Sequence, residues 1–261
     1  MVNYRIVIPT YKRPQILKDK TLKLLESHNI PPSRIDILIS TPEEALEYKL
    51  VLPKIYHKCI IYHYQKGIGP VRNFIQGYYK YETKVKYLVS IDDDIDKILD
   101  WDKPIENLDK FIIDMFYETE VRKLCLWGVS AYHNTFFMKK ELSTNLKYIC
   151  GAFNGIIIDR EKHDIYTEFD HFEDMAFSCE FFLRDGGVVR NNGVSLITKY
   201  FEQKGGICES YGGLEERKKD MALACHDVKD RYGDMVRIVE KKFGYDIRLK
   251  STYKIDNKYN T

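Results

Sequence analysis

The sequence predicts an α/β fold in which a mostly parallel sheet is flanked by helices. Over the first hundred residues, short β-branched apolar runs alternate with amphipathic segments, and this alternation is typical of a parallel sheet with covering helices. Three of the apolar runs end in loops that are rich in polar residues or glycine. Because right-handed crossovers place the C-terminal ends of such strands along one edge, we expect these loops to meet in one crevice.

Each element of the first half has its own signal. The strands are short runs of Ile, Val, Leu and Tyr, and the segments between them mix apolar residues at helical spacing with Lys and Glu. Strands are expected at Tyr4–Ile8, Ile35–Ile39, Ile60–Tyr64 and Val85–Ile91, and helices at Pro14–Ser27, Glu43–Val51 and Val71–Tyr81. The two prolines at 31 and 32 end the first helix, because proline cannot continue it.

The second half is less regular. Helices are expected at Leu108–Tyr117, Glu173–Arg184 and Glu215–Phe243, and strands at Cys125–Val129, Phe136–Lys139, Tyr148–Ile158 and Val188–Asn192. Neither an internal repeat nor a Pro/Gly/Ser-rich linker interrupts the sequence. We therefore expect one domain over residues 1–250, with a smaller mixed region and a C-terminal helix in its second half, followed by a flexible polar tail over 251–261.

The composition excludes several classes of protein. A formal net charge of +2 argues against a protein that coats nucleic acid by charge alone. The sequence contains no run of about 18 apolar residues and no signal peptide, so we expect no membrane span and a cytoplasmic location. The six cysteines form no C-x-x-C pair, which favours reduced, buried thiols over a zinc site or a disulfide framework.

The strongest functional signal is the acidic run Asp92-Asp93-Asp94, which ends the fourth predicted strand in YLVSIDDDID. Three adjacent carboxylates repel one another, and a bound divalent cation offsets the cost of keeping them close. Asp92 and Asp94 point to the same side of an extended backbone, so these two are the expected ligands of Mn²⁺ or Mg²⁺. The alternative is a solvated acidic turn that caps the next helix.

Two loops are expected to share the crevice with the acidic run. The segment 9–13 (PTYKR) follows the first strand, where Tyr11 or the backbone can seat a nucleotide base and Arg13 can approach a phosphate. The segment 66–73 (KGIGPVRN) follows the third strand, and its glycines allow a close approach to a ligand. It matches neither a P-loop nor a dinucleotide-binding fingerprint. Ordinary strand-to-helix turns are the alternative for both loops.

Two further features belong to the second half. Glu173-Asp174 opens a predicted helix, where a carboxylate can act as a general base that deprotonates an acceptor hydroxyl. The alternative is simple capping, because the helix dipole stabilises acidic residues at a helix N-terminus. His226 lies in ALACHDVKDRYG on the last predicted helix and is either a surface histidine or a metal ligand.

Taken in order, the P-T-Y-K-R strand end, the G-x-G-x-x-R-N helix start, the D-D-D strand end and the later E-D pair resemble the GT-A fold nucleotide-sugar glycosyltransferases. The resemblance covers about residues 4 to 190. It implies that residues 1–100 bind a UDP-sugar donor and that residues 101–250 face the acceptor. It also implies that Asp92 and Asp94 form the D-x-D metal motif, with His226 as a third ligand, and that Asp174 or Glu173 is the base. The residues implied around the donor are Pro9, Thr10, Tyr11, Arg13, Gly67, Arg72, Asp92 and Asp93.

A narrower resemblance concerns the acceptor. The compact size, the I-P-T-Y-K-R-P start and the G-I-G-x-x-R-N segment are similar to the virus- and phage-encoded branch associated with TET/JBP oxygenases. This similarity implies transfer from UDP-glucose to 5-hydroxymethylpyrimidine in DNA, in the cytoplasm of a host cell. The stretch from Gly206 to Val236 departs from the commonest members, so a glycan or lipid acceptor stays open. Two further alternatives are a nucleotidyltransferase and a non-catalytic module that binds sugar or nucleic acid.

Overall fold

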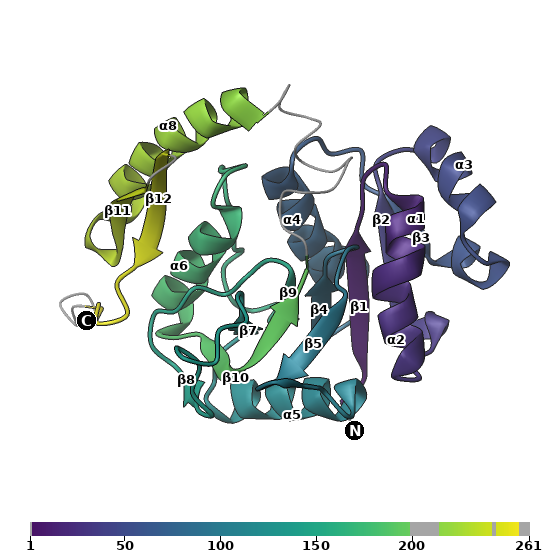
Figure 1. Cartoon of the computed structure of the whole chain (residues 1–261), viewed down its shortest axis with the longest axis horizontal. Helices are drawn as coiled ribbons and strands as arrows, with labels where there is room; N and C mark the ends of the chain where they lie inside the picture. Colours follow the sequence, from purple (N-terminus) through teal and green to yellow (C-terminus); the bar gives the residue numbers. More distant parts are fainter. Residues whose placement is uncertain (1, 199–213, 242–243, 256–261) are drawn as a thin grey trace.

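The computed structural model describes residues 2–198, 214–241 and 244–255. Its centre is a ten-stranded sheet, with helices against it and a smaller C-terminal unit at one end (Figure 1). The α/β architecture that the sequence predicts is therefore confirmed.

The first half of the chain forms the parallel part of the sheet. Its strands are β1 (Tyr4–Pro9), β2 (Ile35–Ile39), β3 (Ile60–Tyr62) and β4 (Tyr87–Ile91). β1 pairs in parallel with both β2 and β4, and β2 pairs in parallel with β3. Every residue of β2 is buried, as expected for a parallel strand that is covered on both faces. All four predicted strands are confirmed, with ends that differ by two residues or fewer.

The second half continues the sheet beyond β4. Its strands are β5 (Lys97–Asp100), β6 (Lys103–Pro104), β7 (Leu126–Ser130), β8 (Leu142–Ser143), β9 (Phe153–Ile157) and β10 (Val189–Ile197). The strand order is β3-β2-β1-β4-β9-β7-β10-β5-β6, and β8 also pairs with β10. β9 runs antiparallel between β4 and β7, whereas β7 and β10 are parallel. β5, β6 and β8 are not predicted, because runs of two to four residues show too little periodicity.

Helices connect most of these strands. They are α1 (Pro14–Leu17), α2 (Lys23–Ser27), α3 (Pro42–Val51), α4 (Ile68–Gly77), α5 (Leu108–Val121), α6 (Glu173–Asp185) and α8 (Leu214–Tyr232), with short 3-10 helices at Pro32–Arg34, Lys54–Cys59 and Gly233–Met235. A π-helical segment, Lys18–Leu22, joins α1 to α2, and another, Tyr78–Glu82, extends α4. α5 runs below the sheet (Figure 1).

Two predicted elements are wrong. Phe136–Lys139 is not a strand: it lies in a turn, and Phe136 and Phe137 are exposed. The helix predicted over Glu215–Phe243 ends at Tyr232, because Gly233 takes a positive φ of 50°. The β-branched residues that follow form β11 (Val236–Lys241), which pairs antiparallel with β12 (Gly244–Leu249).

The C-terminal unit of α8, β11 and β12 packs on α6. The Tyr232 hydroxyl donates a hydrogen bond of 2.9 Å to Glu180 of α6, and the Tyr253 ring lies 6.2 Å from the Phe182 ring, centroid to centroid. Residues 256–261 of the predicted tail lie outside the described residues. The unit therefore extends the core beyond the sheet, since Val228 and Ile247 are also buried in it.

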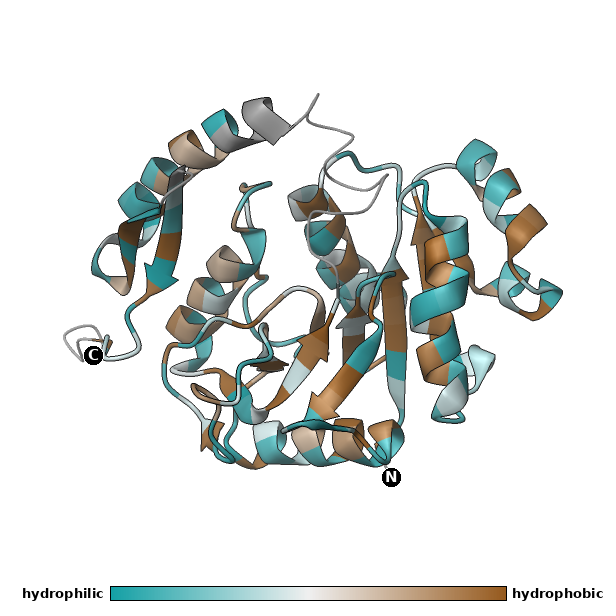
Figure 2. Cartoon of the chain, viewed as in Figure 1, coloured by the Kyte–Doolittle hydropathy of each residue, from teal (hydrophilic) through white to brown (hydrophobic). Residues whose placement is uncertain are grey.

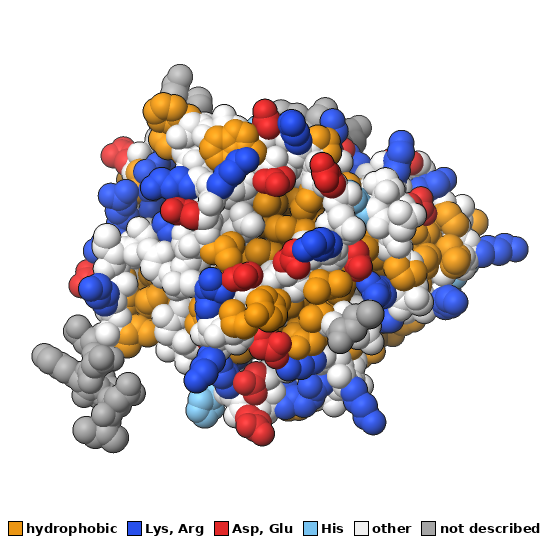
Figure 3. Space-filling view, turned by 90° about the horizontal axis from the view of Figure 1, so that it is seen from below, with side chains coloured by type: hydrophobic (Ala, Val, Ile, Leu, Met, Phe, Trp, Pro, Cys, Tyr) orange, Lys and Arg blue, Asp and Glu red, His pale blue; other side chains and the backbone are white. Residues whose placement is uncertain are grey.

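The surface mixes both signs of charge. On the face seen from below, acidic and basic side chains are interspersed among apolar ones (Figure 3). Ion pairs such as Lys110–Asp114 (2.5 Å) and Lys86–Glu120 (2.6 Å) illustrate this mixture. None of the described helices has the length and apolarity needed to cross a membrane. The five described cysteines are free and buried, as predicted, and Cys208 lies outside the described residues.

Trp127 of β7 is the largest fully buried side chain among the described residues. The rings of Phe116 and Phe153 meet it edge-on, with centroids 5.5 and 5.4 Å away. Gly155 of β9 pairs with Trp127 across the sheet, and a Cβ atom at Gly155 would collide with the indole ring. Only glycine therefore fits opposite this tryptophan. In the molecule as a whole, hydrophobic residues line the strands, and hydrophilic ones dominate the outer helix faces (Figure 2).

Gly155→Ala should lower the free energy of unfolding by about 1–3 kcal/mol, because the added methyl group overpacks the core against Trp127. Urea unfolding followed by circular dichroism measures the change. Gly77→Ala is the matched control: a Cβ there meets nothing within 4 Å, and alanine in a helix should stabilise by about 0.4–1 kcal/mol. Equal effects of the two substitutions would contradict the packing argument.

Candidate active site

The C-terminal ends of β1 and β4 meet, as predicted for parallel neighbours. The Thr10 hydroxyl, just after β1, donates a hydrogen bond of 2.6 Å to Oδ2 of Asp93, just after β4. The same hydroxyl lies 2.8 Å from the Tyr48 hydroxyl of α3. Thr10 and Asp93 are both buried. The first loop and the acidic run therefore form one wall of a common site.

Arg13 brings a positive charge to this wall. Its Nη1 lies 3.4 Å from Oδ1 of Asp93 and 3.5 Å from Oδ2 of Asp94. The loop that presents Arg13 has Lys12 in the left-handed region, with φ 54°, and the Lys12 N–H donates to Glu44 of α3. Non-glycine residues adopt this conformation only where neighbours enforce it, and such residues cluster at functional sites. Tyr11, the predicted base-binding residue, is 39% exposed beside them.

The three carboxylates of the acidic run lie in different surroundings. Their side chains are 34%, 6% and 15% exposed for Asp92, Asp93 and Asp94. Burial raises the pKa of Asp93 to about 7, although Arg13 and Thr10 act in the opposite direction. Burial also raises the pKa of Asp94, as does the charge of Asp92, while the Thr198 hydroxyl lowers it through a bond of 3.0 Å. The run therefore combines one buried anchor with two carboxylates nearer the surface.

This arrangement fits a divalent cation that takes few ligands from the protein. Asp92 and Asp94 are the less buried carboxylates, and a cation would offset the repulsion between them. Among residues 2–198, 214–241 and 244–255, no three His, Cys, Asp or Glu side chains are grouped to hold a metal ion. Mg²⁺ and similar ions commonly use one or two carboxylates and complete their coordination with phosphate oxygens and water.

His226 lies on α8 in the C-terminal unit. Its side chain is exposed, and its ring faces Tyr245 of β12 with the centroids 6.3 Å apart. No described group of potential metal ligands includes His226. Its assignment as a third metal ligand stays a prediction.

Arg72 on the first turns of α4 is the buried cation of the site. Nη1 donates 2.6 Å to Ser90 of β4, and Nη2 donates 2.9 Å to Oδ1 of Asp92. Burial lowers its pKa, but the negative charges of Asp92 and Glu173 outweigh burial and raise the pKa overall. Gly151 gives the guanidinium room, because a Cβ atom there would lie 2.9 Å from Nη2. Arg72 thus contacts the acidic run directly.

Glu173 and Asp174 lie near Arg72, since a Cβ atom at Gly151 would be 2.9 Å from Nη2 of Arg72 and 3.5 Å from Cβ of Asp174. Burial raises the pKa of Glu173 to about 8, and the neighbouring Asp174 carboxylate adds to the increase. The Asp174 carboxylate accepts hydrogen bonds from the Tyr148 hydroxyl (2.5 Å), the Gly151 N–H (3.2 Å) and the Met175 N–H (2.9 Å). Phe172, which precedes the pair, is left-handed with φ 61°. Three donors therefore hold the Asp174 carboxylate, and the general base and the helix cap both stay open as predictions for the pair.

Gly67 lies close to a side chain of the protein itself, the Asp170 carboxylate. It has φ 93°, and a Cβ atom would collide with the Asp170 carboxylate. That carboxylate accepts a hydrogen bond of 3.2 Å from the Gly69 N–H. The glycines thus let the segment before α6 dock on the start of α4, and the predicted contact between Gly67 and a nucleotide stays a prediction.

Several residues of the site are not among those that the sequence analysis predicts. They are Tyr48, Ser90, Tyr148, Asp170 and Thr198. Each contacts a predicted residue through tertiary packing, at separations of up to 104 positions along the chain. Only the end of β4 offered a signal, since Ser90 is a polar residue within an apolar strand.

Comparison with known proteins addresses the fold. No protein-family model and no curated protein matches the sequence. Among solved structures, the chain is similar to the mannosyltransferase PcManGT from Pyrobaculum calidifontis in complex with GDP-Man and Mn²⁺. The identity is 10% over 87% of this chain and 64% of that one, with a TM-score of 0.55. TarS 1–349 from S. aureus aligns over 87% of this chain and 66% of its own at 11% identity, with a TM-score of 0.45.

TarS 1–349 in complex with UDP-GlcNAc aligns at 13% identity, over 87% of this chain and 67% of that one, with a TM-score of 0.49. At these scores TarS adds nothing to the fold assignment. The chain spans less than two thirds of the mannosyltransferase. The similarity to the mannosyltransferase confirms the GT-A fold that the sequence resemblance implies.

Arg72→Leu should lower the free energy of unfolding by about 1.5–3 kcal/mol at pH 8, because it leaves partly buried carboxylates without their cation. The loss should shrink at pH 5, since these carboxylates then take up protons more easily. Urea unfolding at both pH values measures it. Arg122→Leu is the control, because the Arg122–Glu118 pair is a surface pair on α5 worth about 0.5 kcal/mol or less. A loss as small as in the control would contradict the role of Arg72.

Proposed function

We propose that this chain is a glycosyltransferase that moves a sugar from a nucleoside-diphosphate sugar to an acceptor hydroxyl. The observation that carries the proposal is that Arg72 bonds to Asp92 of the acidic run and also lies near the Glu173-Asp174 pair, whose negative charges raise its pKa. A sugar transferase needs both groups within reach of one substrate, one to bind the donor and the other to activate the acceptor. The GT-A fold supports it by analogy, because the similar mannosyltransferase was solved with GDP-Man and Mn²⁺.

The donor half of the site uses the ends of β1 and β4. Pro9, Thr10 and Tyr11 are proposed to border the nucleotide, with Tyr11 exposed enough to stack on a base. Arg13 lies against the acidic run, where its guanidinium can approach a phosphate oxygen. Asp92 and Asp94 would hold Mn²⁺ or Mg²⁺. That ion, when bound, supplies positive charge beside the departing diphosphate.

The acceptor half uses the start of α6. One carboxylate of the Glu173-Asp174 pair would take the proton of the acceptor hydroxyl as the bond to the sugar forms. Arg72 is buried, and its positive charge favours keeping the pair close to the acidic run. A raised pKa suits a general base, because a base works best when its pKa is near the working pH.

A panel of nucleotide sugars tests the function. Hydrolysis of UDP- and GDP-linked sugars is measured with Mn²⁺, with Mg²⁺ and with EDTA. UDP-glucose is the first donor to test, because the sequence resemblance implies it, and GDP-mannose is included because the similar mannosyltransferase binds it. Release of pyrophosphate from nucleoside triphosphates, with no sugar transfer, would support a nucleotidyltransferase instead. Binding of sugars or DNA with no turnover would support a non-catalytic module.

The acceptor is the second variable. DNA with 5-hydroxymethylpyrimidines is the acceptor implied by the sequence resemblance, and we propose it for the first trial. Mass spectrometry detects the mass of an added hexose on the modified base. Glycan and lipid acceptors are tested beside it. Transfer to those acceptors, and none to DNA, would retain the sugar transferase and remove its DNA-modifying version.

Asp94→Asn should reduce the Mn²⁺-dependent affinity for UDP or GDP by about tenfold or more, because it removes one charged ligand. Calorimetric titration with Mn²⁺ and with EDTA measures the effect. The melting temperature should not fall, since burial disfavours the charged form of Asp94. Asp96→Asn is the control, because Asp96 pairs with Lys20 at 3.1 Å. Unchanged metal dependence in the Asp94 variant would contradict the metal assignment.

Glu173→Gln or Asp174→Asn should reduce kcat by about 10²–10⁴-fold with near-normal donor binding, the usual loss when a general base is removed. Asp174→Asn should also destabilise, because an amide cannot accept all three of the donors that now bond to the carboxylate. Glu173→Gln should not destabilise at pH 8, because burial already favours the neutral form.

The pH profile separates the two carboxylates. A base must be deprotonated, so kcat should rise with pH through about 8 if Glu173 is the base. A rise at lower pH that is lost in Asp174→Asn would assign the proton to Asp174. Near-normal kcat in both variants, with only a small change in melting temperature, would leave the pair as a helix cap.

A further inference from the structure

The segment 159–172, which we call the strap, connects β9 to α6 and ends at the proposed base. It contains neither helix nor strand. Its position is therefore not set by a regular backbone ladder, and contacts with side chains have to hold it. The residues that make these contacts come mainly from α4 and its π-helical extension.

Asn73 makes the most specific of these contacts. Its Nδ2 donates 2.6 Å to the Thr167 carbonyl, and its Oδ1 accepts 2.9 Å from the Thr167 N–H. One side-chain amide thus satisfies both main-chain groups of a buried residue, 94 positions away along the chain. Unpaired, these two groups would each cost about 1–3 kcal/mol in a buried setting. These two hydrogen bonds hold the Thr167 main chain, and with it the middle of the strap, against α4.

Further polar contacts hold the strap on either side of Thr167. Towards β9, the Lys80 ammonium donates 2.7 Å to the Lys162 carbonyl and pairs with Asp164. Towards α6, Asp170 accepts the hydrogen bond from Gly69 that was described above. The strap therefore lies along α4, in contact with it from the π-helical extension to the first turn.

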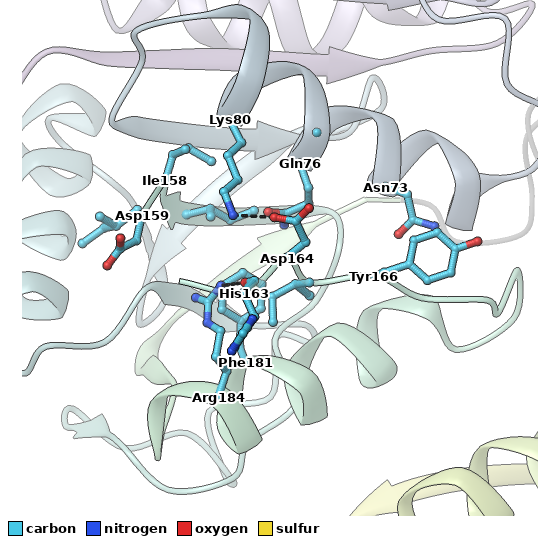
Figure 4. Close-up of a pocket in the computed structure, with 14 residues that line it drawn as sticks. Asn73, Gln76, Lys80, Ile158, Asp159, His163, Asp164, Tyr166, Phe181 and Arg184 are labelled. Atoms are coloured by element: carbon cyan, nitrogen blue, oxygen red, sulfur yellow. Dashed lines mark hydrogen bonds and ion pairs between the residues drawn. The ribbon is translucent and has the colours of Figure 1, made fainter. Parts of the chain in front are cut away.

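A cavity of about 190 Å³ lies under the middle of the strap. Its lining includes Gln76 and Lys80 of the α4 side, Ile158 at the end of β9, and Phe181 and Arg184 of α6. Figure 4 shows Asn73 beside Tyr166 at one end of this cavity and the Lys80–Asp164 pair across it. A space without packed atoms contributes no dispersion contacts to its walls. Ile165 of the strap lines this space and belongs to the hydrophobic core, so this apolar residue and the polar contacts of Asn73 and Lys80 together hold the strap.

We propose that Asn73 is a positioning residue, whose amide holds the strap and thereby sets the place of Glu173-Asp174 relative to Arg72. Arg72 and Asn73 are consecutive on α4, so one helix turn fixes the acidic run through Arg72 and the base through Asn73. The part that concerns catalysis rests on the proposed function. The part that concerns the strap rests on the contacts alone.

Asn73→Ala tests both parts. Hydrogen–deuterium exchange of peptides from 160–172 should become roughly tenfold faster, while peptides from β1 and β2 keep their protection. On the active donor and acceptor, kcat should fall by about 10–100-fold, because small displacements of a reacting group have effects of this size. The Kd of the nucleotide with Mn²⁺ should change by less than about twofold, since the donor half is held by other elements.

Asn145→Ala is the matched control, because Asn145 also donates 2.6 Å to a main-chain carbonyl, that of Ser251, in the C-terminal unit. If Asn73→Ala does not fold, Asn73→Asp replaces it: the carboxylate still accepts the Thr167 N–H, but it loses the donated bond and its second oxygen repels the Thr167 carbonyl. Strap exchange as slow as in the control would overturn the proposal. An equal loss of nucleotide affinity and kcat would overturn it as well. If the wild type transfers no sugar at all, the proposed function fails, and the exchange experiment still decides the role of Asn73.

Discussion

The site depends on one buried guanidinium. Arg72 donates to Asp92 at 2.9 Å, and the nearby negative charges of Glu173 and Asp174 also act on it. Carboxylates from two distant parts of the chain could not share a partly buried space without a cation, because burial and mutual repulsion both disfavour their charged forms. Arginine suits this position, since its planar fork can bond in several directions at once and stays protonated. The relative placement of the acidic run and the Glu173-Asp174 pair follows from this one side chain.

α4 holds Arg72 and Asn73 at fixed positions relative to each other. The helix begins after Gly67, whose positive φ allows Asp170 to dock at its start. Successive residues on a helix point about 100° apart, so Arg72 reaches β4 and Asn73 reaches the strap from adjacent positions. A rigid element thus connects two loops that no strand pairing connects. Sites mounted on rigid elements hold their geometry better than sites built from loops alone.

The elements that sequence could predict are those with strong local patterns. The four parallel strands and α6 follow from apolar runs, the stop at Gly186, and alternation. The meeting of Thr10 with Asp93 follows from topology, because parallel neighbours end on one edge. Phe136–Lys139 has three consecutive apolar residues without alternation, and its strand prediction is wrong. The helix predicted beyond Tyr232 fails because a glycine and a β-branched run outweigh the helical spacing before them.

The partners of the site residues could not be predicted in the same way. Tyr148 bonds to Asp174, and Thr198 bonds to Asp94. Both contacts depend on where β9 and β10 lie in the sheet. Nothing in a stretch of sequence reports such long-range pairing. Arg72 shows the same limit: local spacing places it on the first turns of α4, but only the fold shows that its guanidinium bonds to Asp92. Its predicted contact with the nucleotide sugar stays a prediction.

The same physics explains how three consecutive aspartates can stand at one strand end. Asp93 is the most buried of the three, and burial raises its pKa to about 7, so near neutral pH it is protonated for part of the time. A neutral Asp93 still bonds to Thr10 and adds no repulsion to its neighbours. Asp92 and Asp94 each have a cation beside them, because Arg72 lies 2.9 Å from Asp92 and Arg13 lies 3.5 Å from Asp94. The burial of Asp93 and the arginine partners of its two neighbours therefore let a buried strand end in three consecutive aspartates.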